Sequence, residues 1–516
     1  MNRKNLMYIS DPSQFCCVST PYYECPKESA RGEITLTDEV LEKAVDEVMD
    51  AGVDIFVNEI YGMVPWYPSR VYSLQEHFDW FYNQYGGTQV CGVMNFAAAG
   101  GDLVRVQGEQ VHRRGGKYYL SYRINDHHGM CRDLTPRNVH PRLVSKFYAE
   151  HPEYRINAPQ PNYPWAKYHL DFRFREVIDY KLRILAELIE NYDIDGLMVD
   201  FLRTSVLFNQ ELTTLEERET VITDFFREIR GMLKEKEAKT GKHCRLGAKI
   251  PMDVEGFALL GINIRKLTDA GVEFFSVFDY FCTRQKYDVI DLVKAESGGK
   301  QVFLEMSQAT TWRKCNGMRL MRLSTSEQLA TTAYAAYGHG ADGITLFNFP
   351  WYRAGNEVAF EKLEPPFGMF NTLKNESLLG TLPQYYFEAA TENMIPHGND
   401  LQGFSFVNGS DYRFDVDVRK PSGGYTEDGV FCLESVQNLE NVKFEVRLNG
   451  EALRENNDLE ELYPIVYRSN LAQREQRKRY AVPMGLLKEG KNTVSVRCLT
   501  EQEEAIHLFF MGILIR

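Results

Sequence analysis

The hydrophobic and polar positions of this chain repeat one pattern along its N-terminal two thirds. A helix-like stretch ends, a glycine or an acidic residue marks the turn, and a short apolar run rich in β-formers follows. Four copies of this pattern are DAGVDIFVNE (50–59), YDIDGLMVDF (192–201), DAGVEFFSVFD (269–279) and HGADGITLFN (339–348). Strands that are apolar on both faces and alternate with helices are typical of a parallel sheet.

Further strand and helix patterns fill the gaps between these four copies. The additional strand candidates are residues 6–10, 117–125, 244–252 and 301–307. The helical spacing of Leu41, Ala44, Val45 and Val48 predicts a helix with Thr37 as its N-cap and Gly52 as its C-terminal stop, and a similar stripe predicts another helix before residue 192. Eight such units predict a (β/α)8 TIM barrel over residues 1–378. A doubly wound open sheet is the alternative, but no glycine-rich phosphate loop follows the first strand.

The pattern changes after about residue 380. Short alternating runs are separated by Gly, Asn and Pro, as in YRFDVDVRK (412–420) and GVFCLESV (429–436). This alternation predicts a C-terminal antiparallel β-sandwich over residues 379–516. The final run AIHLFFMGILIR (505–516) is expected to form a further pair of strands.

Composition limits the partners and the compartment. The net charge of −13 argues against nucleic acid or an anionic membrane as a partner, and no apolar run is long enough to span a membrane. The ten cysteines show no CxxC pair or zinc-like spacing, which favours reduced thiols. We expect a cytoplasmic protein, or a periplasmic or secreted one if a leader has been removed. Whether the chain forms a homo-oligomer stays open.

Acidic residues stand at the ends of the predicted strands. In a (β/α)8 barrel the carboxyl ends of all strands meet on one face, which carries the chemistry. A single acid there is often only solvated or paired with an arginine, but a set of acids at successive strands indicates an active site. These acids are Glu59, Asp126, Asp200, Asp253, Glu255, Asp279 and Glu305.

Paired carboxylates on this scaffold point to hydrolysis of a glycosidic bond. One protonated acid serves the leaving oxygen, and one ionised carboxylate attacks the sugar or activates water. We expect Asp200 to be catalytic, with Glu305 as its first-choice partner, Asp279 next, and then Asp253 or Glu255. Which group is the acid, and whether configuration is retained, stays open at this point.

Other polar and aromatic residues near the strand ends are expected to bind the sugar. Polar contacts are assigned to Arg123, Asn125, Asp126, His127, Arg203, Glu255 and Asn348. The arginines would suit an acidic sugar, although pairing with the acids explains them equally well. Stacking surfaces are assigned to Trp66, Trp165, Trp312 and Trp351, which could instead pack loops together.

Two other kinds of site are disfavoured. Adjacent histidines such as His127 and His128 point apart on an extended chain, and no third ligand stands at metal spacing, so we expect neither a metal nor another cofactor. No GxSxG motif is present, which argues against a serine hydrolase.

The stretch YDIDGLMVDFLR (192–203) resembles the fourth strand of the glycosyl-hydrolase-10-like glycosidases, bacterial (β/α)8 proteins of polysaccharide degradation. Tyr192, Asp193, Asp195, Gly196, Asp200 and Arg203 match that pattern, and SYRINDHHG (121–129) is similar to a second segment of the group. The segments VRLNG and VPMGLLKEGKNTVSVRC resemble jelly-roll accessory domains of glycoside hydrolases. The resemblance implies a carbohydrate-active enzyme with Asp200 in or beside its catalytic centre.

Two other classes of protein stay open on the sequence alone. One is a non-catalytic carbohydrate-binding barrel. The other is a metal-dependent lyase or isomerase that uses the strand-end carboxylates as ligands. The sequence does not identify the sugar, its linkage, or exo against endo action.

Overall fold

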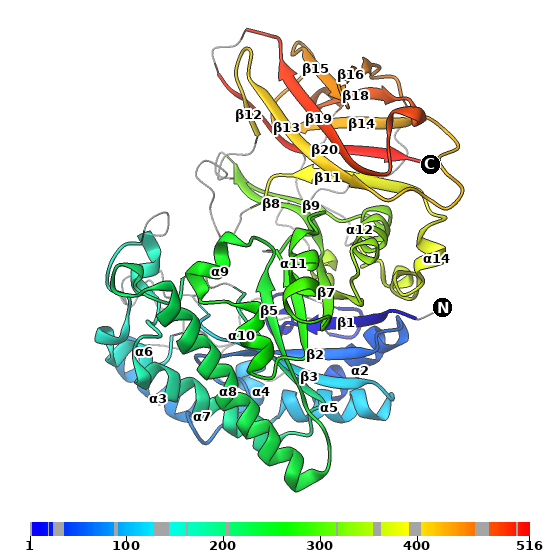
Figure 1. Ribbon diagram of the computed structural model, residues 1–516. Helices are drawn as coiled ribbons and strands as arrows, with labels where there is room; N and C mark the ends of the chain where they lie inside the picture. Colours follow the sequence, from blue (N-terminus) through cyan, green and yellow to red (C-terminus); the bar gives the residue numbers. More distant parts are fainter. Residues whose placement is uncertain are drawn as a thin grey trace.

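The computed structural model shows a barrel joined to a β-sandwich (Figure 1). In Figure 1 the sandwich lies above the barrel, next to helix α12 and the hairpin formed by β8 and β9. The structure describes residues 3–18, 20–23, 36–86, 91–126, 144–160, 164–202, 206–279, 281–315, 318–353, 363–391, 404–459, 474–501 and 504–516.

Eight parallel strands close into the barrel, in the order β1-β10-β7-β6-β5-β4-β3-β2. They are β1 Asn5–Ser10, β2 Ile55–Tyr61, β3 Lys117–Arg123, β4 Gly196–Asp200, β5 Arg245–Pro251, β6 Phe274–Phe278, β7 Gln301–Ser307 and β10 Gly343–Phe347. Each coincides with a strand expected from the hydropathy pattern. Because the last strand pairs with the first, Gly343 beside Asn5, the sheet has no open edge. The predicted (β/α)8 fold is confirmed, and the open sheet is excluded.

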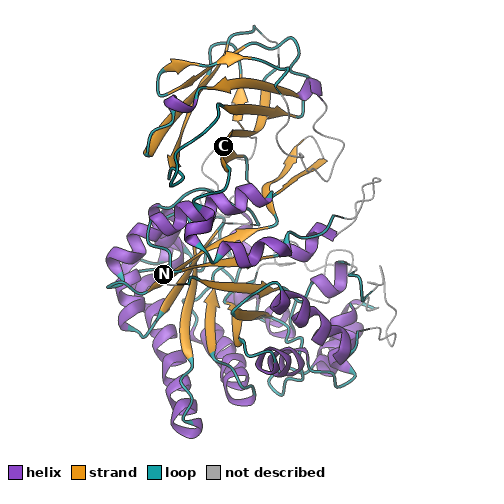
Figure 2. Cartoon of the chain, turned by 90° about the vertical axis from the view of Figure 1, so that its right-hand side faces the viewer, coloured by secondary structure: helices purple, strands orange, loops and turns teal. Residues whose placement is uncertain are grey.

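Helices surround the barrel strands (Figure 2). They are α1 Gln14–Cys17, α2 Asp38–Asp50, α3 Leu74–Tyr85, α4 Gly92–Ala98, α5 Leu103–Arg113, α6 Lys146–Glu150, α7 Arg175–Asn191, α8 Leu215–Thr240, α9 Glu255–Leu260, α10 Ile264–Asp269, α11 Asp288–Glu296, α12 Ser326–Gly338, α13 Phe370–Leu373 and α14 Glu376–Leu379. The expected cap of α2 is present, since the Thr37 hydroxyl accepts a hydrogen bond from the Val40 amide. Such a cap satisfies one of the amides that a helix start leaves unpaired.

Aromatic rings fill the lower part of the barrel interior. The ring centroid of Phe274 lies 5.6 Å from that of Tyr119 and 6.1 Å from that of Phe303. Glycines on neighbouring strands make room for these rings, because a Cβ at Gly247 would lie 2.1 Å from the Phe274 ring. A Cβ at Gly343 would likewise lie 2.7 Å from Phe303. The barrel therefore has a packed aromatic floor below the carboxyl ends of its strands.

The C-terminal part consists of two antiparallel sheets, as the alternating pattern predicted. One has the order β11-β20-β14-β18-β17 with β12 beside β20, and the other has the order β13-β19-β15-β16. The strands are β11 Gln384–Ala389, β12 Phe404–Phe406, β13 Asp411–Val418, β14 Gly429–Ser435, β15 Phe444–Leu448, β16 Glu451–Ala452, β17 Arg454–Glu455, β18 Arg477–Val482, β19 Gly490–Cys498 and β20 Ile506–Ile515. Apolar side chains such as Phe431, Val446 and Val496 form the core of this part.

The expectation of a strand pair at the C-terminus was wrong. The run forms one long strand, β20, which pairs with β11 on one side and β14 on the other. Gly512 does not make a turn there. It lies inside the strand, where a Cβ would be 2.7 Å from the Tyr385 ring, so the glycine provides space for a neighbouring side chain.

A hairpin that the sequence pattern did not reveal connects the two parts. It consists of β8 Ala309–Cys315 and β9 Met318–Leu323 and directly follows β7. Buried Arg322 at its end donates to Glu434 of β14, with Nε 3.1 Å from Oε2, and to the Tyr385 hydroxyl at 3.1 Å. The Phe510 ring lies 3.8 Å from its guanidinium carbon. The sandwich thus holds a segment that begins at the carboxyl end of a barrel strand.

Candidate active site

The carboxyl ends of β3, β4 and β5 carry three charged residues at one level. Arg123 is the register partner of Asp200, and Asp200 is the register partner of Lys249. Residues paired in this way on neighbouring strands face the same side of a sheet. All three side chains are fully buried. They therefore lie inside the barrel, at the upper ends of the strands.

Lys249 joins the two carboxylates that the sequence ranked first. Its Nζ lies 2.9 Å from Glu305 Oε2 and 3.4 Å from Asp200 Oδ2. Because β6 separates β5 from β7, the contact with Glu305 crosses the barrel interior. The ring centroids of Phe278 and Phe347 lie 5.1 Å and 4.5 Å from the same ammonium. Asp200 and Glu305 thus share one buried lysine.

Asp200 is fixed by two hydrogen bonds in addition to its contact with Lys249. Its Oδ1 accepts a hydrogen bond from the Leu202 amide at 2.6 Å, and its Oδ2 accepts one from the Ser121 hydroxyl at 3.2 Å. One donor comes from the loop just after β4 and the other from β3. The strand ends therefore hold this carboxylate in a single orientation.

Glu305 has a different environment. Burial raises its pKa to about 7, with Asp200 adding to the effect while Lys249 and Arg123 oppose it. Neither carboxyl oxygen of Glu305 makes an aligned hydrogen bond with the described residues. Near neutral pH both of its protonation states are populated, which is the property of a group that gives and takes a proton.

Arg123, expected to bind substrate, instead holds three carboxylates. Its Nε lies 2.8 Å from Glu59 Oε1, its Nη1 lies 2.9 Å from Asp126 Oδ2, and its Nη2 lies 3.2 Å from Asp11 Oδ2. The Tyr61 ring centroid is 4.6 Å from the guanidinium carbon. The structure therefore places Arg123 and Asp126 in a buried ion cluster beside Asp200.

The pKa values of two acids in this cluster, Asp11 and Glu59, shift in opposite directions. Burial opposes ionisation of Asp11, but the Arg123 charge and the Tyr61 hydroxyl outweigh it, so the pKa of Asp11 is lowered. For Glu59, burial prevails over the attraction of Arg123, and the pKa is raised well above its usual value. Neighbouring carboxyls thus differ in their affinity for protons, which is typical of catalytic sites.

Asp253 and Asp279 form a second group at the same end of the barrel. Arg284 lies between them, with its Nη1 3.7 Å from Asp253 Oδ2 and 3.4 Å from Asp279 Oδ2. Lys286 Nζ is a further 3.1 Å contact of Asp253. These two acids share Arg284, whereas Asp200 and Glu305 share Lys249.

Several buried polar atoms in this region lack an aligned hydrogen bond among the described residues. They are Lys249 Nζ, both Glu305 oxygens, Asn348 Oδ1 and Trp351 Nε1. Asn348 follows β10 and has φ +63°, a conformation that strains a residue other than glycine and is common at functional sites. A buried polar group without a partner costs about 1–3 kcal/mol, so a ligand or water that supplies partners here would be stabilised.

The other residues expected to bind substrate are dispersed. Asn125 donates to the Leu170 carbonyl at 3.0 Å, and buried Trp66 lies 4.5 Å from the Tyr61 ring centroid. Glu255 is exposed at the first residue of α9. Outside the described part of the chain lie His127, Arg203 and the side chains of Trp165 and Trp312.

Sequence reasoning missed two charged residues of the site, Lys249 and Asp11. A signal existed for Lys249, because it is the one charge inside the apolar run LGAKIPM. A lysine there is costly to bury unless acids accompany it. Asp11 follows the apolar strand LMYIS, just as Asp200 follows its own strand. The acids around Asp200 thus enclose two cations, Arg123 and Lys249, and of these only Arg123 was expected in the site.

Two kinds of feature are absent from the described residues. No group of three or more His, Cys, Asp or Glu side chains among them is arranged to hold a metal ion. None of the described helices has the length and apolar character needed to cross a membrane.

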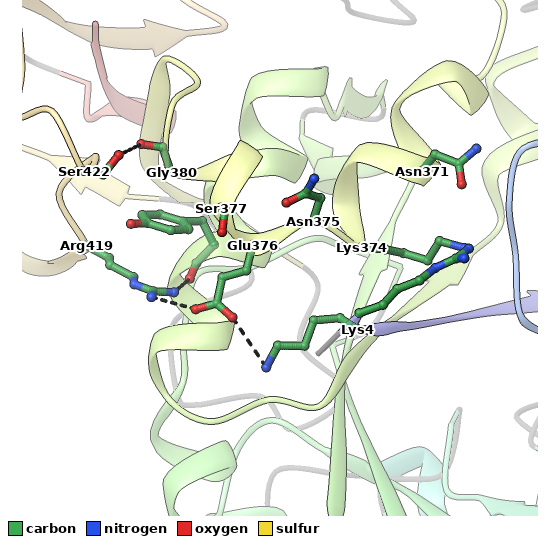
Figure 3. A pocket seen from close by; sticks show the side chains of 11 residues that line it. Lys4, Asn371, Lys374, Asn375, Glu376, Ser377, Gly380, Arg419 and Ser422 are labelled. Atoms are coloured by element: carbon green, nitrogen blue, oxygen red, sulfur yellow. Dashed lines mark hydrogen bonds and ion pairs between the residues drawn. The ribbon is translucent and has the colours of Figure 1, made fainter. Parts of the chain in front are cut away.

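A pocket of about 820 Å³ lies at the opposite end of the barrel (Figure 3). Its lining includes Lys4, just before β1, together with Lys374, Glu376 and Arg419. Glu376 accepts a hydrogen bond from Arg419 at 2.7 Å and lies 3.7 Å from Lys4 Nζ, as the dashed lines in Figure 3 show. Because Glu376 pairs with Lys4 and Arg419, away from the strand carboxyl ends, the pocket is not part of the candidate active site.

Comparison with known proteins gives a weak likeness in structure. No family model matches the chain, and its sequence matches none of the curated proteins compared with it. The family resemblance seen in the sequence therefore stays a prediction.

The solved structures with some similarity to the chain include glycoside hydrolases. The catalytic domain of beta-amylase from Paenibacillus polymyxa shares 12% identity over 73% of this chain and 99% of that chain, with a TM-score of 0.40. A glycoside hydrolase family 18 N-acetylglucosaminidase from Paenibacillus barengoltzii shares 8% over 72% and 99%, with a TM-score of 0.39. A Paenibacillus sp. cycloisomaltooligosaccharide glucanotransferase shares 11% over 99% of this chain and 57% of that chain, with a TM-score of 0.33. Likenesses this weak assign no activity to this chain.

Proposed function

We propose that this protein is a glycoside hydrolase in which Glu305 is the general acid and Asp200 the second carboxylate. The observation that carries the proposal is the meeting of these two acids, from β7 and β4, at the single buried ammonium of Lys249. Glycosidic bond cleavage requires one protonated and one ionised carboxyl group. Two nearby carboxyls in different surroundings divide these roles between them.

The surroundings of the two acids support this division of roles. Glu305, whose pKa burial raises to about 7, keeps its proton until the leaving oxygen takes it. Asp200, oriented by the Leu202 amide and the Ser121 hydroxyl, presents its carboxylate in one fixed direction. A reacting carboxylate that is already in place saves much of the entropy cost of the reaction.

The separation of the pair favours retention of configuration. The contacts with Lys249 limit the distance between Asp200 Oδ2 and Glu305 Oε2 to no more than about 6.3 Å. Retaining pairs lie about 5–5.5 Å apart, and inverting pairs about 6.5–9.5 Å apart. In the retaining reaction Asp200 bonds to the anomeric carbon while Glu305 protonates the departing oxygen. Water then releases the sugar from Asp200 and returns its proton to Glu305. Proton NMR of the first-formed anomer tests this assignment.

The polar atoms that lack an aligned hydrogen bond at or beyond the carboxyl ends of β5, β7 and β10 support a sugar as the ligand. Asn348 Oδ1 accepts and Trp351 Nε1 donates, and Glu305 can do either as its protonation state changes. A sugar hydroxyl both donates and accepts, so one ring could satisfy several of these atoms. The arrangement supports an oligo- or polysaccharide substrate.

Activity measurements test the proposal. Wild type, Asp200→Asn and Glu305→Gln are compared on a panel of aryl glycosides and oligosaccharides. The matched control is Asp224→Asn, which alters an exposed acid on α8 that pairs with Arg227. We expect losses of about 10²–10⁴-fold in the two site variants and none in the control. Failure of wild type to cleave any glycoside, or full activity of both site variants, would refute the proposal.

Two further results of the same experiment would point to other classes. Binding of sugars without cleavage would favour a carbohydrate-binding barrel. Loss of activity on chelation would favour a metal-dependent lyase or isomerase.

A further inference from the structure

The roles proposed for Asp200 and Glu305 do not explain why Lys249 lies between them. It is fully buried, and it is the cation in ion-pair contact with both Asp200 and Glu305 among the described residues. Removing an ammonium and two carboxylates from water is costly, and their mutual attraction offsets that cost only in part. The question is which step requires a positive charge between the two reacting groups.

We propose that Lys249 is the counter-ion that keeps the reacting group of three residues electrically neutral during catalysis, an inference that rests on the proposed function. Before the first step Asp200 is negative, Lys249 is positive and Glu305 is neutral. In that step the bond between the anomeric carbon and the leaving oxygen breaks. Asp200 bonds to that carbon, and the Glu305 proton goes to the leaving oxygen.

The net charge of the three residues is zero both before and after this step. Asp200 becomes a neutral ester, and Glu305 becomes a carboxylate whose Oε2 lies 2.9 Å from Lys249 Nζ. The ammonium therefore exchanges its partner without moving, because it lies within 3.4 Å of both acids. In a buried site an uncompensated negative charge would be strongly penalised, so the ammonium stabilises the charge while it passes from Asp200 to Glu305. Lys249 acts through Asp200 and Glu305 and is a positioning residue.

The charge of Lys249 argues against a role as a nucleophilic amine. Burial lowers its pKa, but Asp200 and Glu305 outweigh burial and raise it. The side chain is therefore an ammonium without a free electron pair. An imine with a carbonyl substrate would need the neutral amine.

Few other charged groups act on Glu305 in the described part of the barrel. Asp200 and Arg123 contribute from β4 and β3, and Glu59 of β2 acts on Lys249. The strands on either side of β7 are β6, Phe274–Phe278, and β10, Gly343–Phe347, and neither contains a titratable residue. Lys249 is thus the charged group nearest to Glu305 that can be substituted while both carboxyl groups, Asp200 and Glu305, are kept.

Infrared spectroscopy can follow protonation of Glu305 without any substrate. The carbonyl band of the protonated Glu305 carboxyl is identified by its absence in Glu305→Gln, and its pH midpoint is compared between wild type and Lys249→Met. The matched control is Lys181→Met, which removes a fully buried amine of α7 that donates to the Gly62 carbonyl. Lys249→Arg keeps the charge and serves as the rescue variant.

Loss of the positive charge favours the neutral acid, so the Glu305 midpoint rises. We expect a rise of about one pH unit or more in Lys249→Met, and little change in Lys181→Met or Lys249→Arg. In activity assays the basic limb of the kcat/KM profile moves to higher pH by the same amount, and kcat falls more than tenfold while KM changes little.

Three outcomes would decide against parts of this scheme. An unchanged midpoint in folded Lys249→Met would overturn the inference. So would labelling of Lys249 by borohydride in the presence of an aldose or ketose, since it would show an imine. A shifted midpoint in an enzyme that cleaves no glycoside would uphold the coupling of the two residues and overturn the proposed function.

Discussion

Glu305 Oε2 of β7 lies 2.9 Å from Lys249 Nζ of β5. The two strands are not neighbours in the sheet, so this contact crosses the interior of the barrel. This contact depends on closure of the barrel, because β6 would otherwise keep the two side chains apart. It links Glu305, whose pKa is raised, to Lys249, which also contacts Asp200.

The role of Glu305 as proton donor predicts a dependence on the leaving group. Glu305→Gln should lose about 10²–10⁴-fold in kcat on glycosides with a poorly leaving alcohol. It should keep most of its kcat/KM on dinitrophenyl glycosides, because that phenolate leaves without a proton and kcat/KM reports the first step alone. Asp200→Asn should lose activity on both kinds of substrate. Equal losses of Glu305→Gln on the two substrates would contradict the assignment.

The raised pKa of Glu305 also predicts a gain in stability on its removal. Folding shifts this pKa from 4.5 to about 7, so the folded state binds the proton more tightly and stability falls as pH rises through that window. Above pH 7 the full penalty is about 3 kcal/mol. Urea unfolding of Glu305→Gln should show a gain approaching that size at pH 8 that largely vanishes at pH 4. A variant less stable than wild type at both pH values would argue against this interpretation.

Arg123 should be essential for stability because three buried acids depend on it. Arg123→Met should lower the free energy of unfolding by about 3–5 kcal/mol at pH 8. Without the arginine the pKa of Asp11 rises, so protonation at pH 5 should relieve part of the loss. Thermal melts at the two pH values measure the difference. The control is Arg227→Met, which removes one partner of an exposed ion pair. An equal loss of stability for Arg123→Met at both pH values would contradict the dependence of the buried acids on Arg123.

The buried pair of Arg322 and Glu434 should couple the barrel to the sandwich. Removal of either partner alone leaves an unpaired buried charge and should cost about 3–5 kcal/mol. The double variant Arg322→Met with Glu434→Met should cost less than the sum of the two single changes. Urea unfolding gives the three values. The exposed pair of Arg175 and Glu228 should contribute no more than about 1 kcal/mol in the same cycle, and strict additivity for the buried pair would refute the coupling.

The aromatic floor of the barrel predicts a contrast between two glycines. Gly247→Ala would put a Cβ 2.1 Å from the Phe274 ring and should destabilise the protein by about 1–3 kcal/mol. Gly231 lies inside α8 with nothing within 4 Å of an added Cβ, so Gly231→Ala should stabilise it by about 0.5–1 kcal/mol. Thermal melting compares the two. An unchanged melting temperature for Gly247→Ala would show that the floor can rearrange.

The strands of the barrel could be located from the sequence because each is an apolar run bounded by turn residues. The acids Asp200 and Glu305 were found in the same way, since each stands at or near the end of such a run. The hairpin of β8 and β9 was missed, because its alternation is weak and it interrupts the expected order of strand and helix. The C-terminal strand was misassigned because a glycine in it provides space for a ring and does not turn the chain.

The linear pattern of residues was enough to establish the (β/α)8 order, the change to a sandwich near residue 380, and a row of acids at the strand ends. It could not show which acids share a partner, because a hydropathy pattern carries no information on barrel closure or register across the interior. Only the tertiary structure placed Lys249 between Asp200 and Glu305, and Arg123 among Asp11, Glu59 and Asp126. The physical reason is that burial makes each charge depend on its nearest partner, and those partners come from strands far apart in the chain.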